Sequence, residues 1–220
     1  MNNLIRNILK EYEEKENVLT IPSLSYFGDS WHTLREYLKS KGSPKWEILD
    51  DLFLSYKPIE SLENLQSVGY NLFLGYTQIK SLGNLHSVGL NLDLSNTQIE
   101  SLGNLQSVGY NLDLTETPIK SLGNLQSVGR DLYLSYTSIE SLGNLEVVGR
   151  DLGLKGTRVK SLDNLKSVGG GLDLGYTPIK SLGNLQSVGG DLLLYNTPLS
   201  EKYTEEEIRQ MVDVGGKIYM

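Results

Sequence analysis

Hydrophobic and polar residues along the chain follow a 20-residue period over about residues 43–200. In the coil 101–120, Leu112 and Leu114 alternate with polar neighbours. A period of two predicts a short β-strand that turns its leucines inward and its polar residues outward. Each coil is therefore expected to contribute one short strand.

Between one strand and the next, apolar residues recur at every third position, as Leu102, Leu105 and Val108 do. This spacing fits either one tight turn of helix or an extended return path. If it is a tight turn, Asn104 would cap its start and Gly109 would end it in the left-handed conformation. Ten residues leave no room for a long α-helix, so we expect little helix in the repeats.

Residues 61–200 divide into seven regular coils, and residues 41–60 form an eighth, degenerate coil. A single coil cannot bury its apolar face alone, so neighbouring coils must stack and join their leucines into one core. Stacked strands would then form a parallel sheet. The pattern predicts a repeat solenoid over residues 43–200.

The repeated segment L-x-L-x-x-T-x-I resembles the leucine-rich-repeat core L-x-L-x-x-N-x-L. The resemblance implies an α/β solenoid, a right-handed superhelix with a parallel β-sheet on its concave face. Its short, regular coils are similar to those of bacterial or bacteriophage leucine-rich-repeat proteins. Threonine stands where the family has asparagine, so the family's asparagine ladder does not carry over, and we expect threonine hydroxyls to bond to neighbouring backbone instead. These threonines are Thr77, Thr97, Thr117, Thr137, Thr157, Thr177 and Thr197.

The ends of a solenoid need covers, and residues 1–42 read as a helical N-terminal cap. Residues 1–16 have the spacing of an amphipathic helix, and residues 30–40 predict a second helix with Trp31 among its inward residues. Lys57 replaces the threonine of its column, where no earlier coil would receive the hydroxyl bond. A partner-docking helix is the functional alternative for this end.

Residues 201–220 predict a C-terminal cap made of a helix and a strand. Thr204 and Glu207 form a capping box that opens a helix through about Met211. A last strand is expected over residues 217–220, after two glycines.

Composition narrows the function classes. The formal net charge is -7 and the pI is about 4.9, which argues against a nucleic-acid binder, since phosphate contacts require a basic surface. The chain has no cysteine and two histidines. We find no catalytic motif, phosphate-binding loop or metal-ligand pattern, so we expect no enzyme activity, cofactor or metal. No segment reads as a signal peptide or membrane span, which favours a cytoplasmic protein.

One column alternates in sign along most of the stack, so that each side chain would face an opposite charge one coil away. We interpret it as a surface ladder with little functional weight, since exposed ion pairs contribute only about 0–1 kcal/mol. The column holds Glu60, Lys80, Glu100, Lys120, Glu140, Lys160 and Lys180.

Three outward columns vary although the frame of the repeat does not. One lies within the strand, one just past it and one just before it. Aromatic residues and arginine are frequent at binding hot spots, so these columns are the candidate ligand-binding surface on the concave face. The candidate residues are Phe53, Tyr56, Phe73, Tyr76, Asp93, Tyr110, Asp113, Glu116, Arg130, Tyr133, Tyr136, Arg150, Lys155, Asp173 and Tyr176.

Stacking these columns predicts three zones: an aromatic patch near the N-terminal end, an acidic middle, and a basic-aromatic zone. The third zone would combine the arginines with Lys155 and Arg158, beside a dent left by Gly153 and Gly156. Aromatic residues also suit strands, so shielding of the first coil is the structural alternative.

We expect a monomeric, non-catalytic module that binds another protein through its concave face. A glycan-binding module and a structural or self-assembling component are the alternatives, because planar aromatics beside Asp and Asn suit sugar rings and because solenoids can stack end to end. The repeat pattern itself does not indicate which ligand is bound.

Overall fold

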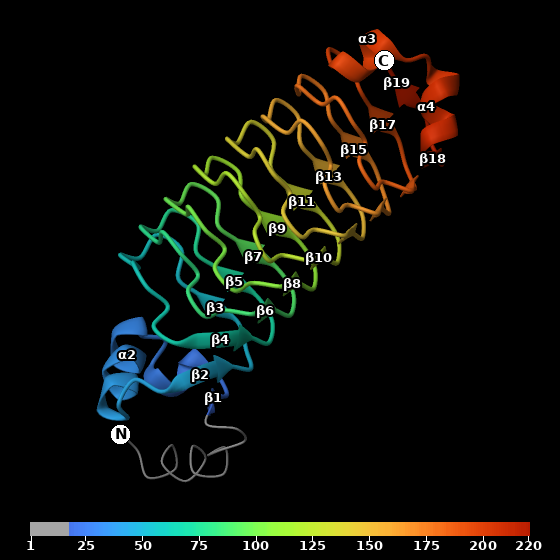
Figure 1. Cartoon of the computed structure of the whole chain (residues 1–220). Helices are drawn as coiled ribbons and strands as arrows, with labels where there is room; N and C mark the ends of the chain where they lie inside the picture. Colours follow the sequence, from blue (N-terminus) through green and yellow to red (C-terminus); the bar gives the residue numbers. More distant parts are fainter. Residues whose placement is uncertain (1–17) are drawn as a thin grey trace.

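The computed structural model describes residues 18–220, so the helix expected over residues 1–16 lies outside the described part of the chain. The described chain winds into an elongated parallel β-solenoid whose coils stand side by side, with the C-terminus at the far end of the stack from α2 (Figure 1). None of the helices in this part is both long and apolar enough to cross a membrane.

Each regular coil carries two short strands, which form two continuous parallel sheets. Sheet A has ten strands and sheet B has nine, and equivalent residues pair at intervals of 20, as Leu112 with Leu132. Sheet A consists of β1 (Val18–Ile21), β2 (Lys45–Ile48), β4 (Leu65–Val68), β6 (Ser87–Val88), β8 (Ser107–Val108), β10 (Ser127–Val128), β12 (Val147–Val148), β14 (Ser167–Val168), β16 (Ser187–Val188) and β18 (Asp213–Val214). Sheet B consists of β3 (Leu52–Phe53), β5 (Leu72–Phe73), β7 (Leu92–Asp93), β9 (Leu112–Asp113), β11 (Leu132–Tyr133), β13 (Leu152–Gly153), β15 (Leu172–Asp173), β17 (Leu192–Leu193) and β19 (Ile218–Tyr219).

The leucine strand predicted from the sequence is sheet B, and its inward residues Leu112 and Leu114 are fully buried. The return path is extended and forms sheet A, so of the two predicted alternatives the tight helical turn is wrong. No helix lies between α2 and residue 198. Asn104 therefore caps no helix, and Leu102, Leu105 and Val108 are buried from an extended chain. The core runs as stacked aliphatic columns through every coil.

Gly109 does not adopt a left-handed conformation, contrary to expectation. A Cβ atom at this position would lie 1.9 Å from the carbonyl oxygen of Gly89 in the preceding coil. Glycine is required here because the two backbones approach too closely for any side chain. The left-handed glycine is Gly103, whose φ is 60°. A second left-handed residue, Glu116, follows the sheet B strand.

The buried threonines bond within their own coil and not to a neighbouring one. The Thr117 hydroxyl donates to the Leu114 carbonyl at 2.6 Å, and five other threonines make the equivalent bond. The Thr77 hydroxyl is buried without a partner. Because the bond needs no adjacent coil, the reason offered for Lys57 is wrong.

At the N-terminal end, β1 adds a strand to sheet A and is followed by a short 3-10 helix, η1 (Leu24–Phe27). The predicted helix is confirmed as α2 (Trp31–Ser40), capped by Ser30, and the Trp31 ring packs on buried Trp46 at 6.1 Å. Neither β1 nor η1 was predicted from the sequence pattern.

At the C-terminal end, the predicted capping box is confirmed in α4 (Glu205–Met211) and the predicted last strand in β19. A further helix, α3 (Pro198–Lys202), is capped by Thr197 and was not predicted. Both sheets continue beyond the last regular coil, because β18 and β19 pair with β16 and β17.

Candidate functional site

The three variable columns all lie along the outer side of sheet B, which we call the sheet B face. The strand column holds the second residue of each sheet B strand, from Phe53 to Leu193. The turn column lies three residues later and the pre-strand column three residues earlier. Residues between the columns contact them: Lys155 lies over the Tyr176 ring of the turn column, and Asp131 accepts a bond from the Tyr133 hydroxyl of the strand column. The candidate residues therefore share one surface.

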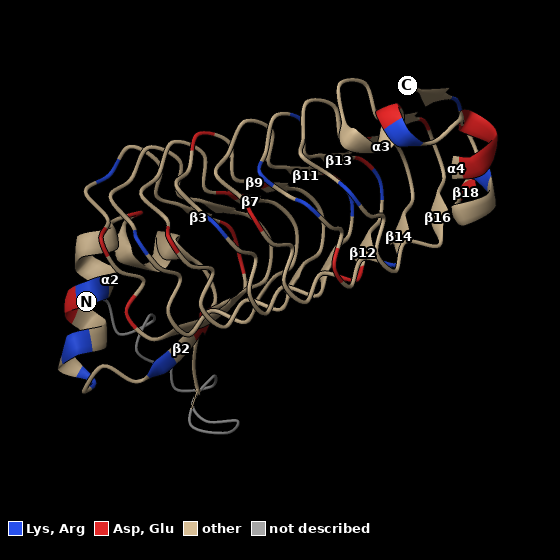
Figure 2. Ribbon diagram, turned by 45° about the horizontal axis from the view of Figure 1, so that its top comes forward, with Lys and Arg blue, Asp and Glu red and all other residues tan. Residues whose placement is uncertain are grey.

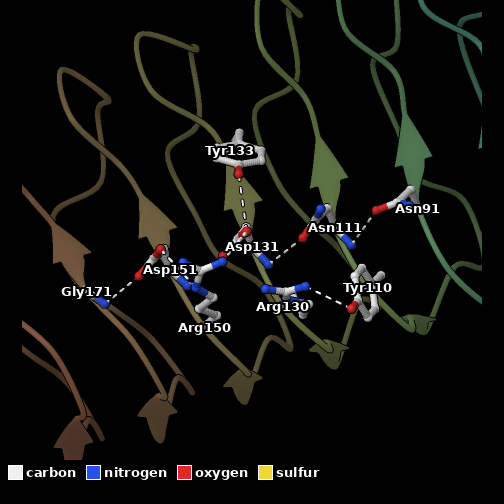
Figure 3. Close-up of polar contacts among 9 residues, drawn as sticks. All are labelled: Asn91, Tyr110, Asn111, Arg130, Asp131, Tyr133, Arg150, Asp151 and Gly171. Carbon is white, nitrogen blue, oxygen red and sulfur yellow. Dashed lines mark hydrogen bonds and ion pairs between the residues drawn. The ribbon is translucent and has the colours of Figure 1, made fainter.

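An asparagine and aspartate ladder crosses this face one position before each strand, and the sequence reading missed it. The side-chain oxygen of Asn91 accepts the backbone N–H of Asn111 at 3.3 Å, and Asn111 does the same for Asp131 at 3.1 Å. Asp131 in turn accepts the N–H of Asp151 at 3.1 Å (Figure 3). The signal was a column occupied by Asn or Asp in nearly every coil: Asp51, Asn71, Asn91, Asn111, Asp131, Asp151 and Asp191.

The ladder marks the point where backbone bonding changes direction. Backbone N–H groups just before it donate to the previous coil, as Arg130 does to Tyr110, whereas those just after it donate to the next coil, as Leu132 does to Asp151. The N–H of Asp131 still points backward, where the side chain of Asn111 provides the acceptor. The ladder thus holds the backbone in place between the pre-strand column and the strand column.

The turn column holds its side chains outward from a left-handed backbone. Tyr56, Tyr76, Tyr136 and Tyr176 have φ between 58° and 60°, a conformation that costs a bulky residue about 1–2 kcal/mol. Their exposures are 76%, 53%, 70% and 56%. Glycine or asparagine would fit this turn with less strain, so the tyrosines are held there against the backbone preference.

The aromatic patch predicted near the N-terminal end is present. Phe53 and Phe73 stack at 5.3 Å between ring centroids, and Tyr56 and Tyr76 stack at 4.7 Å, both nearly parallel. Tyr70 adds a half-exposed ring that was not among the candidate residues. Each ring covers one face of its partner, and the exposed parts of the patch include ring edges and the tyrosine hydroxyl groups.

Both arginines of the predicted basic zone are held by neighbours on the same face, and Arg150 has acidic partners. Arg130 lies over the Tyr110 ring at 4.6 Å and donates to its hydroxyl at 2.8 Å. Arg150 lies 3.8 Å from Asp131 and 3.6 Å from Asp151 (Figure 3). The two aspartates were missed because they belong to the ladder column and not to a variable one.

The Tyr133 hydroxyl donates to the Asp131 carboxylate at 3.3 Å. Burial raises the pKa of Tyr133 above its ordinary value, and the negative charge of Asp131 raises it further. Tyr133 therefore stays neutral and acts as a donor, and nothing in this arrangement activates it as a base or nucleophile.

Lys155 points among three tyrosines, and its Nζ lies 5.6 Å from the ring centroids of both Tyr176 and Tyr195. Hydrogen bonding to Tyr136 and Tyr195 raises the pKa of Lys155. The dent expected at Gly156 is filled, because a Cβ atom there would lie 2.6 Å from the Tyr136 ring. At Gly153 a Cβ atom would lie 3.0 Å from the Ser135 hydroxyl.

The acidic middle lies in the strand and turn columns, as predicted. The carboxylate of Asp93 accepts bonds from the backbone and hydroxyl of Ser95, and that of Asp113 accepts the backbone N–H of Thr115. Asp173 bonds likewise to Gly175. One oxygen of each carboxylate thus stabilises its own turn, and the second oxygen makes no hydrogen bond within that turn. Charged residues are scattered along the coils and gather on α4 (Figure 2).

Arg158 does not join the basic cluster. It lies beyond the turn column and lines a separate cavity of about 410 Å³ with Glu140, Lys160 and Pro178. The alternating column forms no ion pair with any residue of the described chain, and ion pairs between neighbouring coils join Lys166 to Glu146 at 2.6 Å and Arg150 to Asp131 at 3.8 Å.

Comparison with models of protein families, with curated proteins and with solved structures finds no match to this chain. Within residues 18–220, no group of three or more histidine, aspartate or glutamate side chains is arranged to hold a metal ion.

Proposed function

We propose that the protein is a non-catalytic binding module that recognises another protein through the sheet B face. The observation that carries this proposal is the row of exposed tyrosines in the left-handed turn column. Strained, outward-facing Tyr56, Tyr76, Tyr136 and Tyr176 do not contribute to the core, and strained residues of this kind cluster at binding sites.

The polar contacts of the face also favour protein binding. Arg130, Arg150 and Lys155 are held by neighbouring tyrosines and aspartates, so little side-chain freedom is lost when a partner docks. Tyrosine and arginine are the residue types that most often dominate protein interfaces. A face prepared in this way can bind a partner without rearranging.

A glycan fits the aromatic patch less well. Sugar rings pack on aromatic ring faces, and each ring of the Phe53–Phe73 and Tyr56–Tyr76 pairs has one of its two faces covered by its partner. Ring edges and tyrosine hydroxyls suit peptide groups and apolar side chains of a protein surface.

We further propose that the solenoid is a leucine-rich-repeat variant of bacterial or bacteriophage type, a right-handed superhelix with sheet B on its concave side and capped ends. Besides the sequence motif, the backbone bonding on the side of the coils that belongs to neither sheet A nor sheet B, around the Glu/Lys column, supports a curved stack. Backbone bonds there link alternate pairs of coils, as Glu100 with Lys80 and Glu140 with Lys120. Interrupted bonding on one side is expected for the longer outer arc. We propose a soluble cytoplasmic monomer.

Site-specific photocrosslinking tests the surface. A photoreactive phenylalanine analogue in place of Tyr76 should give a discrete adduct with one partner in extract of the source cells. The same analogue in place of Gln98, an exposed residue outside the three columns, should give none. Adducts of equal yield at both positions would contradict recognition by the sheet B face.

A further inference from the structure

β3 is the terminal strand of sheet B, and no strand of the described chain pairs with its outer edge. Sheet A extends one coil further at this end, because β1 pairs with β2. Ile21 is in register with Ile48, so η1 follows β1 at the place in the coil where a preceding sheet B strand would lie. The chain passes this place as a 3-10 helix and leaves β3 unpaired.

The unpaired edge presents carbonyl groups in strand register. In later coils, the equivalent carbonyls accept N–H groups from the coil before, as Phe73 does from Leu54 at 2.8 Å. The carbonyls of Asp51 and Phe53 hold the same positions in the first coil, and no residue in 18–220 donates to them. An edge of this kind is a template for pairing with another extended chain.

A cavity of about 400 Å³ lies along this edge. Residues 23–25 of the η1 region line one side, and Asp50, Asp51 and Phe53 line the other. η1 therefore stands off from β3 and does not close the edge. An extended segment of three residues spans roughly 10 Å, which is the length of edge that β3 and its flanking residues offer.

Charge around the cavity is mainly negative. Asp29, Asp50 and Asp51 contribute three carboxylates against the single ammonium group of Lys57. The Asp29 carboxylate makes no hydrogen bond or ion pair with another residue of the described chain. The Asp51 carboxylate is already braced, because it accepts two hydrogen bonds from Asn71. A cationic ligand is therefore favoured.

We propose that the outer edge of β3 receives a short, extended, lysine- or arginine-bearing segment of a partner protein as an added strand of sheet B. Backbone N–H groups of the segment donate to the carbonyls of Asp51 and Phe53, and its cationic side chains lie beside Asp29 and Asp50. This is strand addition, in which main-chain bonds give affinity and alternate side chains give specificity. The site uses the backbone edge of β3 and shares only Phe53 with the sheet B face, so the two proposals can fail separately.

Three fluorescein-labelled octapeptides test the proposal on the full chain by fluorescence anisotropy. The first alternates lysine and valine, the second is the same peptide with alternate backbone nitrogens methylated, and the third alternates glutamate and valine. We expect the first to bind, the second to bind about tenfold more weakly because it lacks half its donors, and the third not to bind. Amide shifts in a ¹⁵N-labelled sample should fall on residues 23–29 and 50–55.

The double variant Asp29→Asn, Asp50→Asn should weaken the affinity for the lysine peptide by about three- to tenfold. The matched control Asp213→Asn, Glu205→Gln removes the same charge at the opposite end and should leave binding unchanged. Equal affinity of the methylated peptide, equal weakening by the control, or amide shifts elsewhere would overturn the proposal. Self-association of the chain that the peptide displaces would also overturn it, by making a second copy the occupant. Peptide binding without photocrosslinks at Tyr76 would support the β3 edge site and contradict the proposed function of the sheet B face.

Discussion

The side chain of Asp151 accepts a hydrogen bond of 2.7 Å from the backbone N–H of Gly171, and Gly171 has no side chain to do the same for the next coil. The ladder is interrupted there. No residue of the described chain accepts the backbone N–H of Asp191, whereas Asp191 itself accepts from Lys217 at 2.8 Å.

Gly171→Asn should complete the ladder and stabilise the protein. A Cβ atom at Gly171 would lie 3.5 Å from the Asp151 carboxylate and 3.6 Å from the Asp191 carbonyl, both ordinary contacts. One recovered hydrogen bond is worth about 1 kcal/mol, which raises the melting temperature of a chain of this size by roughly 2–4 °C. Thermal unfolding followed by circular dichroism measures it. The control Gly170→Asn should destabilise, because its Cβ would lie 2.3 Å from the Asp151 carboxylate.

Gly129→Ala should destabilise far more than a change at a left-handed glycine. A Cβ atom at Gly129 would lie 2.0 Å from the Gly109 carbonyl oxygen, so two coils must separate, at a cost of about 3 kcal/mol or more. Gly123 has φ of 57° with open space around it, and Asp163 occupies the equivalent position. Gly123→Asp should therefore cost only about 1 kcal/mol. Urea unfolding of both variants compares them, and equal losses would contradict the backbone-contact argument.

The column of Gly103 and Gly123 and the column of Gly109 and Gly129 also show how far a sequence can distinguish a left-handed turn from close backbone contact. Both predict a left-handed turn when each is considered alone. The position of Gly103 admits Glu63 and Asp163, which is typical of a left-handed turn open to solvent. The position of Gly109 admits glycine alone throughout the regular coils, and that strictness was the available sign of backbone contact.

The buried columns could be predicted because burial follows the repeat period. Leu112, Leu114 and Val108 are inward in the structure as in the pattern, and stacking of Phe53 on Phe73 follows from their shared column. The second sheet could not be predicted, since a period of three fits an extended chain and a tight turn equally well.

The charge of the candidate site was harder to predict than its location. Column by column, Arg130 and Arg150 stand out as cations. Their partners lie one coil back: Tyr110 holds Arg130 by its ring and hydroxyl, and the Asp131 carboxylate offsets the charge of Arg150. Asp131 also belongs to a different column. Only the stacking distance and the side-chain directions bring these groups together.

Asp131→Asn should lower the pKa of Tyr133 back toward its ordinary value near 10. Burial remains in the variant, but the negative charge that further raises the pKa is removed. An asparagine oxygen can still accept the Asp151 N–H, as Asn111 accepts that of Asp131, so the ladder is kept. NMR titration of the labelled tyrosine rings measures the change. Titration of Tyr133 together with the exposed tyrosines in the parent protein would contradict the assignment.

The same raised pKa links Tyr133 to stability at alkaline pH. A group whose folded pKa exceeds its unfolded value contributes stability that is full below about pH 10 and is lost as pH rises through the folded pKa. Tyr133→Phe cannot ionise, so its stability should fall less steeply than that of the parent above pH 10. Urea unfolding at pH 8 and pH 11 gives the two slopes. A parallel decline in both proteins would exclude Tyr133 as a contributor.

Two threonines at equivalent positions should respond in opposite ways to loss of their hydroxyl groups. The Thr117 hydroxyl donates to the Leu114 carbonyl at 2.6 Å, whereas the Thr77 hydroxyl is buried without a partner. Valine has nearly the same shape as threonine, so Thr117→Val removes a hydrogen bond and should cost about 1 kcal/mol. Thr77→Val removes an unsatisfied polar group and should be neutral or slightly stabilising. Urea unfolding of the two variants decides between these outcomes, and equal losses would mean that the Thr77 hydroxyl finds a partner in solution.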